Sequence, residues 1–186
     1  ELVNASDGQG LHFDGAAGSV AFTPVDLGTK VSFEFIIQAD SWDVSATNYI
    51  VDYATGGRFI IGSSTDTSGN LGIHSAGGWG SFGSNPLADL KVHHIVVTID
   101  GTAAILYDNG NQAATLTINS PNIDSCSAAR IASDSAGTAS FIDGTFYRTR
   151  FWNKTLTQAE VTASYENATV PFADQYGSQT NLITGA

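Results

Sequence analysis

Hydrophobic and polar residues alternate along much of the chain. The clearest example is Lys30–Gln38, in which every second position is apolar: Val31, Phe33, Phe35 and Ile37. Because successive side chains of a β-strand point to opposite faces, this alternation predicts a strand with one buried face. The other face carries Ser32 and Glu34, and we expect Glu34 to be a polar residue on the solvent side.

The strongest hairpin signal lies in the middle of the chain. Val92–Ile99 and Ala103–Tyr107 are strand-like segments joined through Asp100-Gly101, and a second turn leads into Gln112–Ile118. Asp-Gly between two such segments is typical of a β-hairpin, so the stretch predicts an antiparallel meander. Further strands are predicted at Leu11–Gly15 with Ser19–Phe22, Asn48–Tyr53, Arg58–Ser63, Asn70–His74, Ala128–Ala132 and Phe141–Trp152.

One short helix is predicted near the end of this all-β pattern. Thr157-Gln158-Ala159-Glu160 has the capping-box spacing, which indicates a helix that runs to about Ser164. Beyond Asn167 the apolar periodicity ends. We therefore expect one domain over residues 1–167, a size that suits a single all-β domain. Residues 168–186 are expected to form a C-terminal tail or a linker to a following module.

Several of these segments resemble motifs of one known family. His93–Thr98, Asp100-Gly101 and Leu106–Gly110 resemble, in that order, the core motif of laminin-G-like, concanavalin A-like jelly-roll domains. Leu11–Gly15 resembles the opening motif of the family, and six residues match its closing motif: Gly144, Arg150, Trp152, Asn153, Leu156 and Thr157. The resemblance implies a two-sheet antiparallel β-sandwich, a jelly roll, with one short C-terminal helix.

The charge of the chain narrows the choice of partners. It has 7 Lys and Arg against 18 Asp and Glu, for a net charge of −11. Nucleic acid is not expected as a partner, because phosphate binding needs clustered cations. No apolar run approaches 18 residues, so we expect no membrane insertion. The single cysteine, Cys126, excludes an internal disulfide and a cysteine-based zinc cluster.

Catalysis is not expected from the carboxylates of this sequence. Glycoside hydrolysis needs two carboxylates across the scissile bond, and jelly-roll glucanases of related shape place theirs in an E-x-D-x-E strand that this chain lacks. Its glutamates are Glu1, Glu34, Glu160 and Glu166. His93 and His94 point to opposite faces of one strand, so they cannot readily chelate one ion together, and we interpret them as scaffold.

Aromatic residues in loops are the candidates for ligand binding. Sugar rings present apolar C–H faces, which flat indole surfaces can accept while polar neighbours bond the hydroxyls. Trp79 and Phe82 lie in a glycine-rich loop, Gly77–Pro86, and His74 precedes it; Trp42 lies in an earlier polar loop. The alternative is that Trp42 and Phe82 fold back and plug the ends of the sandwich.

Calcium is the cofactor that the resemblance implies. Ca²⁺ binds several oxygen ligands from carboxylates and loop carbonyls, and related jelly rolls imply a structural Ca²⁺ near the first turn and the last strand. Asp14 and Asp143 are the carboxylates nearest to those places. The alternative is that Asp14 caps a turn and Asp143 makes an ordinary backbone hydrogen bond. Tyr147-Arg148 stand where the family has an Asp pair, which weakens the case for calcium.

The sequence therefore predicts a non-catalytic binding module for a glycan or polysaccharide, or for adhesion. We expect it to belong to a larger extracellular, cell-surface or virion protein, with neighbouring modules as further partners. A structural spacer in a phage or surface assembly is the first alternative. A glycoside hydrolase is the second.

Overall fold

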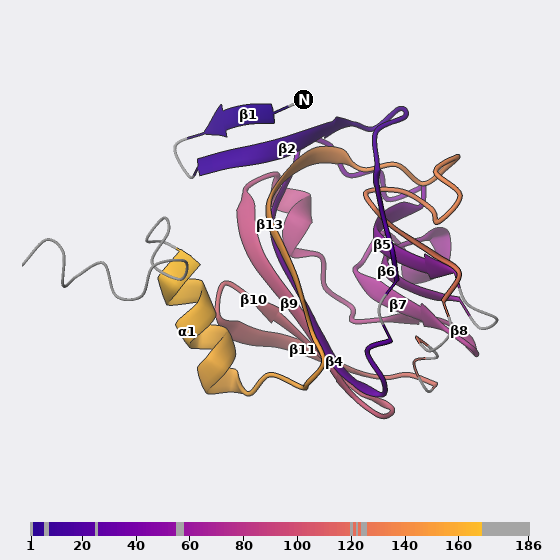
Figure 1. Cartoon of the computed structure of the whole chain (residues 1–186), viewed down its shortest axis with the longest axis vertical. Coiled ribbons are helices and arrows are strands. Elements are labelled where there is room, and N and C mark those ends of the chain that lie inside the picture. The colour runs from indigo at the N-terminus through magenta and orange to yellow at the C-terminus, as the bar shows by residue number, and fades with distance from the viewer. Residues whose placement is uncertain are drawn as a thin grey trace, which may run out of the picture.

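Two antiparallel sheets pack face to face in the computed structural model, which describes residues 2–5, 8–24, 26–54, 58–119, 121, 123 and 126–168 (Figure 1). The seven-stranded sheet has the order β1 (Leu2–Ala5), β2 (Gly8–Asp14), β13 (Asp143–Trp152), β4 (Lys30–Ala39), β9 (Val92–Asp100), β10 (Ala103–Asp108) and β11 (Asn111–Thr117). The six-stranded sheet has the order β3 (Val20–Phe22), β12 (Ala128–Ile131), β5 (Asn48–Ala54), β6 (Phe59–Ser63), β7 (Gly72–Ser75) and β8 (Gly78–Ser81). The predicted sandwich and its β9–β10–β11 meander are confirmed.

Helical structure is limited in the described chain to two 3₁₀ turns and α1. The turns are η1 (Thr65–Thr67) and η2 (Pro86–Asp89), and α1 spans Gln158–Ala168. The capping box is confirmed, since Glu160 Oε2 accepts a 2.8 Å bond from the Thr157 amide and the Glu160 amide donates to Thr157 Oγ1 at 3.3 Å. No helix among the described residues is long and apolar enough to cross a membrane. The predicted tail lies outside the described residues from position 169 onward.

The glycine-rich segment Gly77–Pro86 was predicted to be a loop, and this prediction is wrong. The segment contains β8, which pairs with β7 in the register Ser75↔Gly78 and His74↔Trp79. Gly78 turns the chain at φ +105°, a conformation that L side chains rarely adopt. Glycine thus makes the tight turn possible, and Trp79 lies on a strand beyond it.

The core lies between the inner faces of the two sheets. Val31, Phe33, Phe35 and Ile37 of β4 are all 0% exposed, which confirms the alternation predicted for this strand. Phe33 stacks on Phe59 of the opposite sheet with ring centroids 5.3 Å apart. Burial of a large apolar side chain contributes about 1.5–3 kcal/mol, so these aromatic contacts are a main source of stability.

The outer face of β4 is also buried, which contradicts the prediction that Glu34 faces solvent. Ser32 and Glu34 are both 0% exposed. Helix α1 lies beside the outer face of this sheet (Figure 1), and a second apolar cluster forms there from Val96, Tyr107, Leu156 and Val161. The helix therefore excludes water from the outer face of β4, which the alternating pattern of that strand had assigned to solvent.

Polar groups from three elements surround the Glu34 carboxylate. Ser164 Oγ of α1 donates to Oε1 at 2.7 Å, Trp152 Nε1 of β13 donates to Oε2 at 3.1 Å, and His94 Nε2 of β9 lies 3.1 Å from Oε1. Burial alone would raise the pKa of Glu34, but hydrogen bonds from His94 and Ser164 outweigh it and lower the pKa to about 2. Glu34 is therefore an ionised anchor between the sheet and the helix.

His93 and His94 contact different faces of the sheet, as predicted. His93 is held between two carboxylates, with Nδ1 2.7 Å from Asp108 Oδ1 and Nε2 2.9 Å from Asp89 Oδ1. His94 contacts Glu34 on the helix side. Because the two imidazoles have separate partners, both belong to the scaffold.

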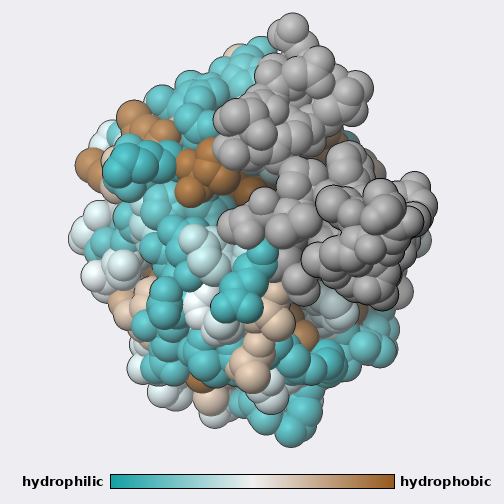
Figure 2. Space-filling model, turned by 90° about the vertical axis from the view of Figure 1, so that its left-hand side faces the viewer, coloured by the Kyte–Doolittle hydropathy of each residue, from teal (hydrophilic) through white to brown (hydrophobic). Residues whose placement is uncertain are grey.

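The described part of the surface is mostly hydrophilic on the side that faces the viewer in Figure 2, with hydrophobic residues confined to small patches. Among the large hydrophobic residues described, Val44 and Leu90 are exposed. A binding surface has therefore to be sought in particular groups of side chains, since no broad apolar patch marks one on this side.

Candidate functional sites

The register of the six-stranded sheet brings two predicted site residues together on its outer face. Phe59 and Ile61 belong to the core, so Ile60 between them points outward. Ile60 pairs with His74, and His74 pairs with Trp79. The His74 and Trp79 rings consequently lie side by side, with centroids 5.5 Å apart and planes at 78°.

Tyr49 and Arg58 complete this group, which we call the Trp79 face (Trp79, His74, Tyr49 and Arg58). The Tyr49 and Trp79 ring centroids are 5.9 Å apart, and Arg58 Cζ lies 5.3 Å from the Tyr49 ring centroid. Tyr49 is 7% exposed, whereas Trp79 is only half-buried. The face therefore offers a partly exposed indole beside a second, more deeply buried aromatic ring.

A buried carboxylate fixes the cation of the Trp79 face. Arg58 Nη2 donates to Asp52 Oδ2 at 2.7 Å, and Asp52 is 0% exposed. The hydrogen bond to Asp52 raises the pKa of Arg58, which keeps the guanidinium charged. The Ser135 amide also donates to Asp52 Oδ2, at 2.8 Å. An oriented guanidinium beside an aromatic surface can donate hydrogen bonds to ligand hydroxyl or carboxylate oxygens.

The other two predicted binding residues lie elsewhere and contact the core. Trp42 is half-buried, packs against the core and donates a 2.9 Å hydrogen bond from Nε1 to the carbonyl of Gly69. Phe82 is 7% exposed and belongs to the core itself. These positions agree with the alternative in which Trp42 and Phe82 plug the sandwich.

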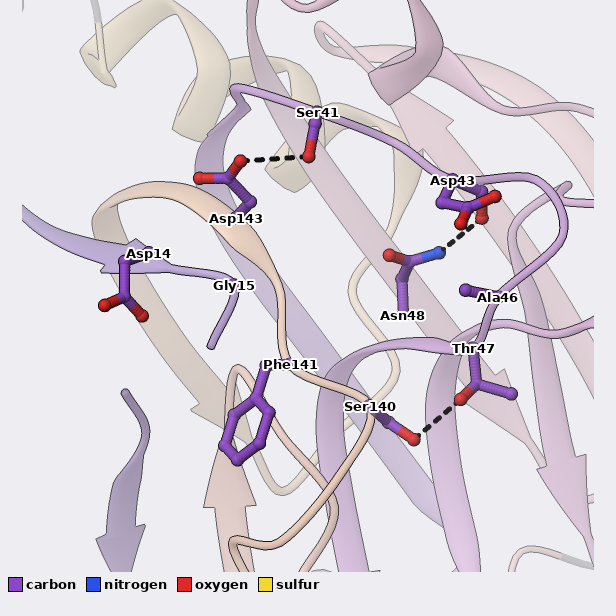
Figure 3. Close-up of a pocket in the computed structure, with 10 residues that line it drawn as sticks. All are labelled: Asp14, Gly15, Ser41, Asp43, Ala46, Thr47, Asn48, Ser140, Phe141 and Asp143. Atoms are coloured by element: carbon purple, nitrogen blue, oxygen red, sulfur yellow. Dashed lines mark hydrogen bonds between the residues drawn. The ribbon is translucent and has the colours of Figure 1, made fainter. Parts of the chain in front are cut away.

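A polar cleft of about 420 Å³ opens where β2, β4, β5 and β13 meet their connecting loops (Figure 3). It is lined by Asp14, Gly15, Ser41, Asp43, Ala46, Thr47, Asn48, Ser140, Phe141 and Asp143. Both predicted metal ligands are in this set, and they are directly opposite each other in the β2–β13 register, Asp143↔Asp14. The predicted pair therefore shares one cleft.

The two carboxylates have different partners within the cleft. Asp14 Oδ1 accepts bonds from the amides of Ala16 at 3.0 Å and Ala17 at 3.3 Å, and these bonds lower its pKa. Asp143 Oδ2 accepts a 2.9 Å bond from Ser41 Oγ. In Figure 3 the Asp143 side chain turns toward Ser41, while the Asp14 side chain turns to the other side. Asp14 thus caps the turn after β2.

Hydrogen bonds also fix the side of the cleft that Thr47, Asn48 and Ser140 form. Asn48 Nδ2 donates to the Asp43 carbonyl at 2.9 Å and to Ser63 Oγ at 3.1 Å, and the hydroxyls of Thr47 and Ser140 are 2.7 Å apart. Carboxylate, hydroxyl and carbonyl oxygens are ligands that Ca²⁺ prefers. The donor set of the cleft fits that ion.

Comparisons with known proteins agree with this architecture. Residues 14–162 match a family model described as the concanavalin A-like lectin/glucanases superfamily. No curated protein matches the chain. The chain is similar in structure to the binding domain of Paraclostridial Mosquitocidal Protein 1, with a TM-score of 0.69, 14% identity, and coverage of 90% of this chain and 45% of that one.

Two further solved structures share the fold. Domain 4 of AbnA, an extracellular arabinanase from Geobacillus stearothermophilus solved in complex with arabinotriose, has a TM-score of 0.65 at 13% identity, with 87% of this chain and 79% of that chain covered. The binding domain of Botulinum Neurotoxin DC, in complex with SialylT, has a TM-score of 0.64 at 13% identity, with 90% and 44% covered. The chain thus spans less than half of the mosquitocidal and neurotoxin structures.

Tyr49 and Arg58 are the site residues that sequence reasoning missed. Tyr49 lies in β5, a segment correctly predicted to be a strand, whereas Arg58 directly precedes β6, which begins at Phe59. The pattern around Tyr49 has apolar groups on both faces. A register shift between Tyr49 and Val51 also interrupts the pairing of β5 with β6. Such an irregularity changes the direction in which a side chain points, and the local sequence does not predict it.

Proposed function

Because the chain belongs to the concanavalin A-like lectin/glucanase superfamily, we propose that it is a non-catalytic glycan-binding module that uses the Trp79 face. The observation that carries this proposal is the cross-strand row Ile60–His74–Trp79, which presents an indole on the outer face of a sheet. The indole stacks on the apolar face of a sugar ring. Arg58 and His74 bond the oxygens at its edge.

Two structural relatives support glycans as the class of ligand. One was solved with arabinotriose and another with SialylT. Their identity to this chain is 13% in each case, so the similarity supports the fold alone. The class of ligand is part of our proposal. By the same reasoning we place the module in a larger extracellular, cell-surface or virion protein with neighbouring modules.

Two of the described glutamates, Glu34 and Glu160, give little support to a hydrolase. Glu34 is fully buried, ionised and engaged by four side chains, Arg148 among them, so it has neither a proton to donate at neutral pH nor access to a substrate. Glu160 caps α1 and has its pKa lowered to about 2, chiefly by its hydrogen bond from Lys154. A general acid needs a raised pKa in a cleft, and neither residue meets that requirement.

Calcium enters the proposal as a structural ion of the polar cleft. Asp143 holds the ion together with hydroxyl and carbonyl oxygens of the cleft, and Asp14, whose side chain points away from Asp143, joins them after its side chain turns into the cleft. When bound, the ion neutralises carboxylates at the junction of β2 and β13. Its role is to stabilise the strand ends, and glycan binding at the Trp79 face does not require it.

A glycan array followed by calorimetry with the best ligand tests the function and the site separately. Trp79→Ala should weaken binding at least tenfold, since aromatic anchors commonly contribute about 2 kcal/mol or more. Trp42→Ala is the matched control and should retain wild-type affinity, with the fold of both variants checked by circular dichroism. Wild-type affinity in folded Trp79→Ala would refute the site. A folded wild-type chain that binds no glycan would refute the function and favour a structural spacer.

A further inference from the structure

We propose that His12, Asp40 and Asp143 form a binding site for a divalent transition-metal ion of the Zn²⁺ class. One ligand atom from each of these three side chains lies within 4.8 Å of the other two. The site shares no residue with the Trp79 face and lies at the end of the other sheet. Its existence is therefore independent of the glycan-binding proposal.

Three adjacent strands hold the ligands. His12 belongs to β2 and Asp143 to β13, and Asp40 directly follows β4; these strands are neighbours in the order β2–β13–β4. The Asp40 amide donates a 3.0 Å bond to the Asp143 carbonyl, and His12 pairs in register with Thr145. Sites supported by strands are positioned more firmly than sites on loops.

The spacing of the ligand atoms suits a small ion. His12 Nε2 and Asp40 Oδ2 are 3.0 Å apart and share a hydrogen bond, which a bound ion would replace. With zinc bonds of about 2.0–2.2 Å to imidazole nitrogen and carboxylate oxygen, the ligand atoms of a tetrahedral site lie roughly 3.4 Å apart. Small rotations of the side chains therefore bring all three atoms onto one ion.

The chemistry of the ligands favours a transition metal over calcium. Ca²⁺ takes oxygen ligands, whereas imidazole suits Zn²⁺ and its neighbours in the first transition row. Ser41 Oγ donates to Asp143 Oδ2 at 2.9 Å and so orients that carboxylate from outside the ligand set. Because of His12, this cluster prefers a transition-metal ion. The cleft beside it is lined by oxygen atoms and lacks that preference.

The charge and the exposure of the three ligand residues also favour a bound cation. The cluster holds two carboxylates and one imidazole in a chain with a net charge of −11, and Asp14 and Asp43 line the adjoining cleft. This concentration of negative charge attracts a cation. The side chains of His12 and Asp40 are 29% and 41% exposed, so a water molecule or an oxygen of a ligand can occupy the fourth position. Three protein ligands with one open position is an arrangement that zinc adopts.

Isothermal titration of the metal-free 186-residue chain with Zn²⁺, and in parallel with Ca²⁺ and Mg²⁺, tests the proposal. We expect a saturable Zn²⁺ site with a stoichiometry of one. His12→Gln and Asp40→Asn should each weaken Zn²⁺ binding at least tenfold. Asp43→Asn removes one negative charge in the same cleft and is the matched control; it should change Zn²⁺ affinity less than threefold.

Absorption spectra of the Co²⁺-loaded chain, recorded on variants whose fold is checked by circular dichroism, give a second readout that reports the coordination of the ion directly. The wild type should show the d–d bands of a four- or five-coordinate site, and His12→Gln should lose them. Zn²⁺ binding of wild-type strength in His12→Gln would overturn the proposal. Equal losses in His12→Gln and Asp43→Asn would also overturn it, because general electrostatic attraction would then account for binding.

Discussion

Ser164 of α1 donates a 2.7 Å hydrogen bond to the carboxylate of Glu34, a residue 130 positions earlier in the chain. This bond joins the helix to the middle of β4. It also explains why an acidic residue can be fully buried, because the charge is met by hydrogen-bonding groups from β9, β13 and α1. The helix is thus docked by a charged contact as well as by apolar packing.

Glu34→Gln should destabilise the fold by about 1–3 kcal/mol, the usual cost of leaving buried hydrogen-bonding groups without a suitable partner. The amide of Gln places a donor where the carboxylate accepts from Ser164 and Trp152. Urea unfolding measures the change. Glu160→Gln, on the exposed first turn of α1, is the control and should lower the free energy of unfolding clearly less than Glu34→Gln does. Equal losses for the two variants would contradict the anchor role of Glu34.

The same carboxylate predicts a dependence of stability on pH. The pKa of Glu34 is about 2 in the folded chain against an ordinary value of 4.5. A lowered pKa in the folded state stabilises the fold above the unfolded-state pKa, and this contribution is lost as the pH falls through about 4.5 toward 2. It amounts to about 3 kcal/mol when complete. The difference in unfolding free energy between the wild type and Glu34→Gln should therefore shrink from pH 5 to pH 2; a constant difference would contradict the assignment.

The burial of Glu34 shows where local sequence patterns stop being informative. Alternation in Lys30–Gln38 correctly indicated the core face, and the capping box correctly located the start of α1. Neither pattern specifies that the helix lies against the outer face of β4. That outcome depends on packing between segments more than a hundred residues apart, which no local periodicity records.

The Trp79 face illustrates the same limit for the site. Glycines around Trp79 drew attention to this indole, although they belong to a turn and a strand and not to a loop. His74 could be named because it precedes that segment. Tyr49 and Arg58 join the group through strand register and a bulge in β5, so they become visible only in three dimensions.

Asp52→Asn should weaken glycan binding by releasing Arg58. The carboxylate is 0% exposed and bonds Nη2 of Arg58 at 2.7 Å, so its loss leaves the guanidinium free to adopt other orientations. We expect a threefold to tenfold drop in affinity by calorimetry and a loss of about 1.5–3 kcal/mol in stability. Asp100→Asn breaks an exposed ion pair with Lys30 and should change stability by less than about 1 kcal/mol and affinity not at all. An unchanged affinity in Asp52→Asn would exclude Arg58 as a ligand contact.

Gly15→Ala should disturb the polar cleft and both of its proposed ion sites. Gly15 has φ +70°, and a Cβ there would lie 2.9 Å from Cβ of Asp143. Gly28 has φ +66° with nothing within 4 Å of a Cβ, so Gly28→Ala isolates the backbone cost of about 1–2 kcal/mol. Gly15→Ala should cost more than Gly28→Ala and should also weaken Zn²⁺ binding. Equal costs and intact Zn²⁺ binding would show that Asp143 accommodates the methyl group.

Variants of Asp14 and His12 should distinguish the proposed Ca²⁺ site from the proposed Zn²⁺ site. Thermal unfolding with increasing Ca²⁺ should raise the melting temperature of the wild type, because a ligand at 100 times its Kd stabilises the native state by about 2.7 kcal/mol. Asp14→Asn should abolish the rise with Ca²⁺ and keep the rise with Zn²⁺, whereas His12→Gln should do the reverse. Asp143 is common to both sets, so Asp143→Asn should abolish both rises and excess Ca²⁺ should reduce apparent Zn²⁺ affinity in the wild type. A calcium response that survives Asp14→Asn would remove Asp14 from the ligand set and leave Ca²⁺ to the other oxygens of the cleft.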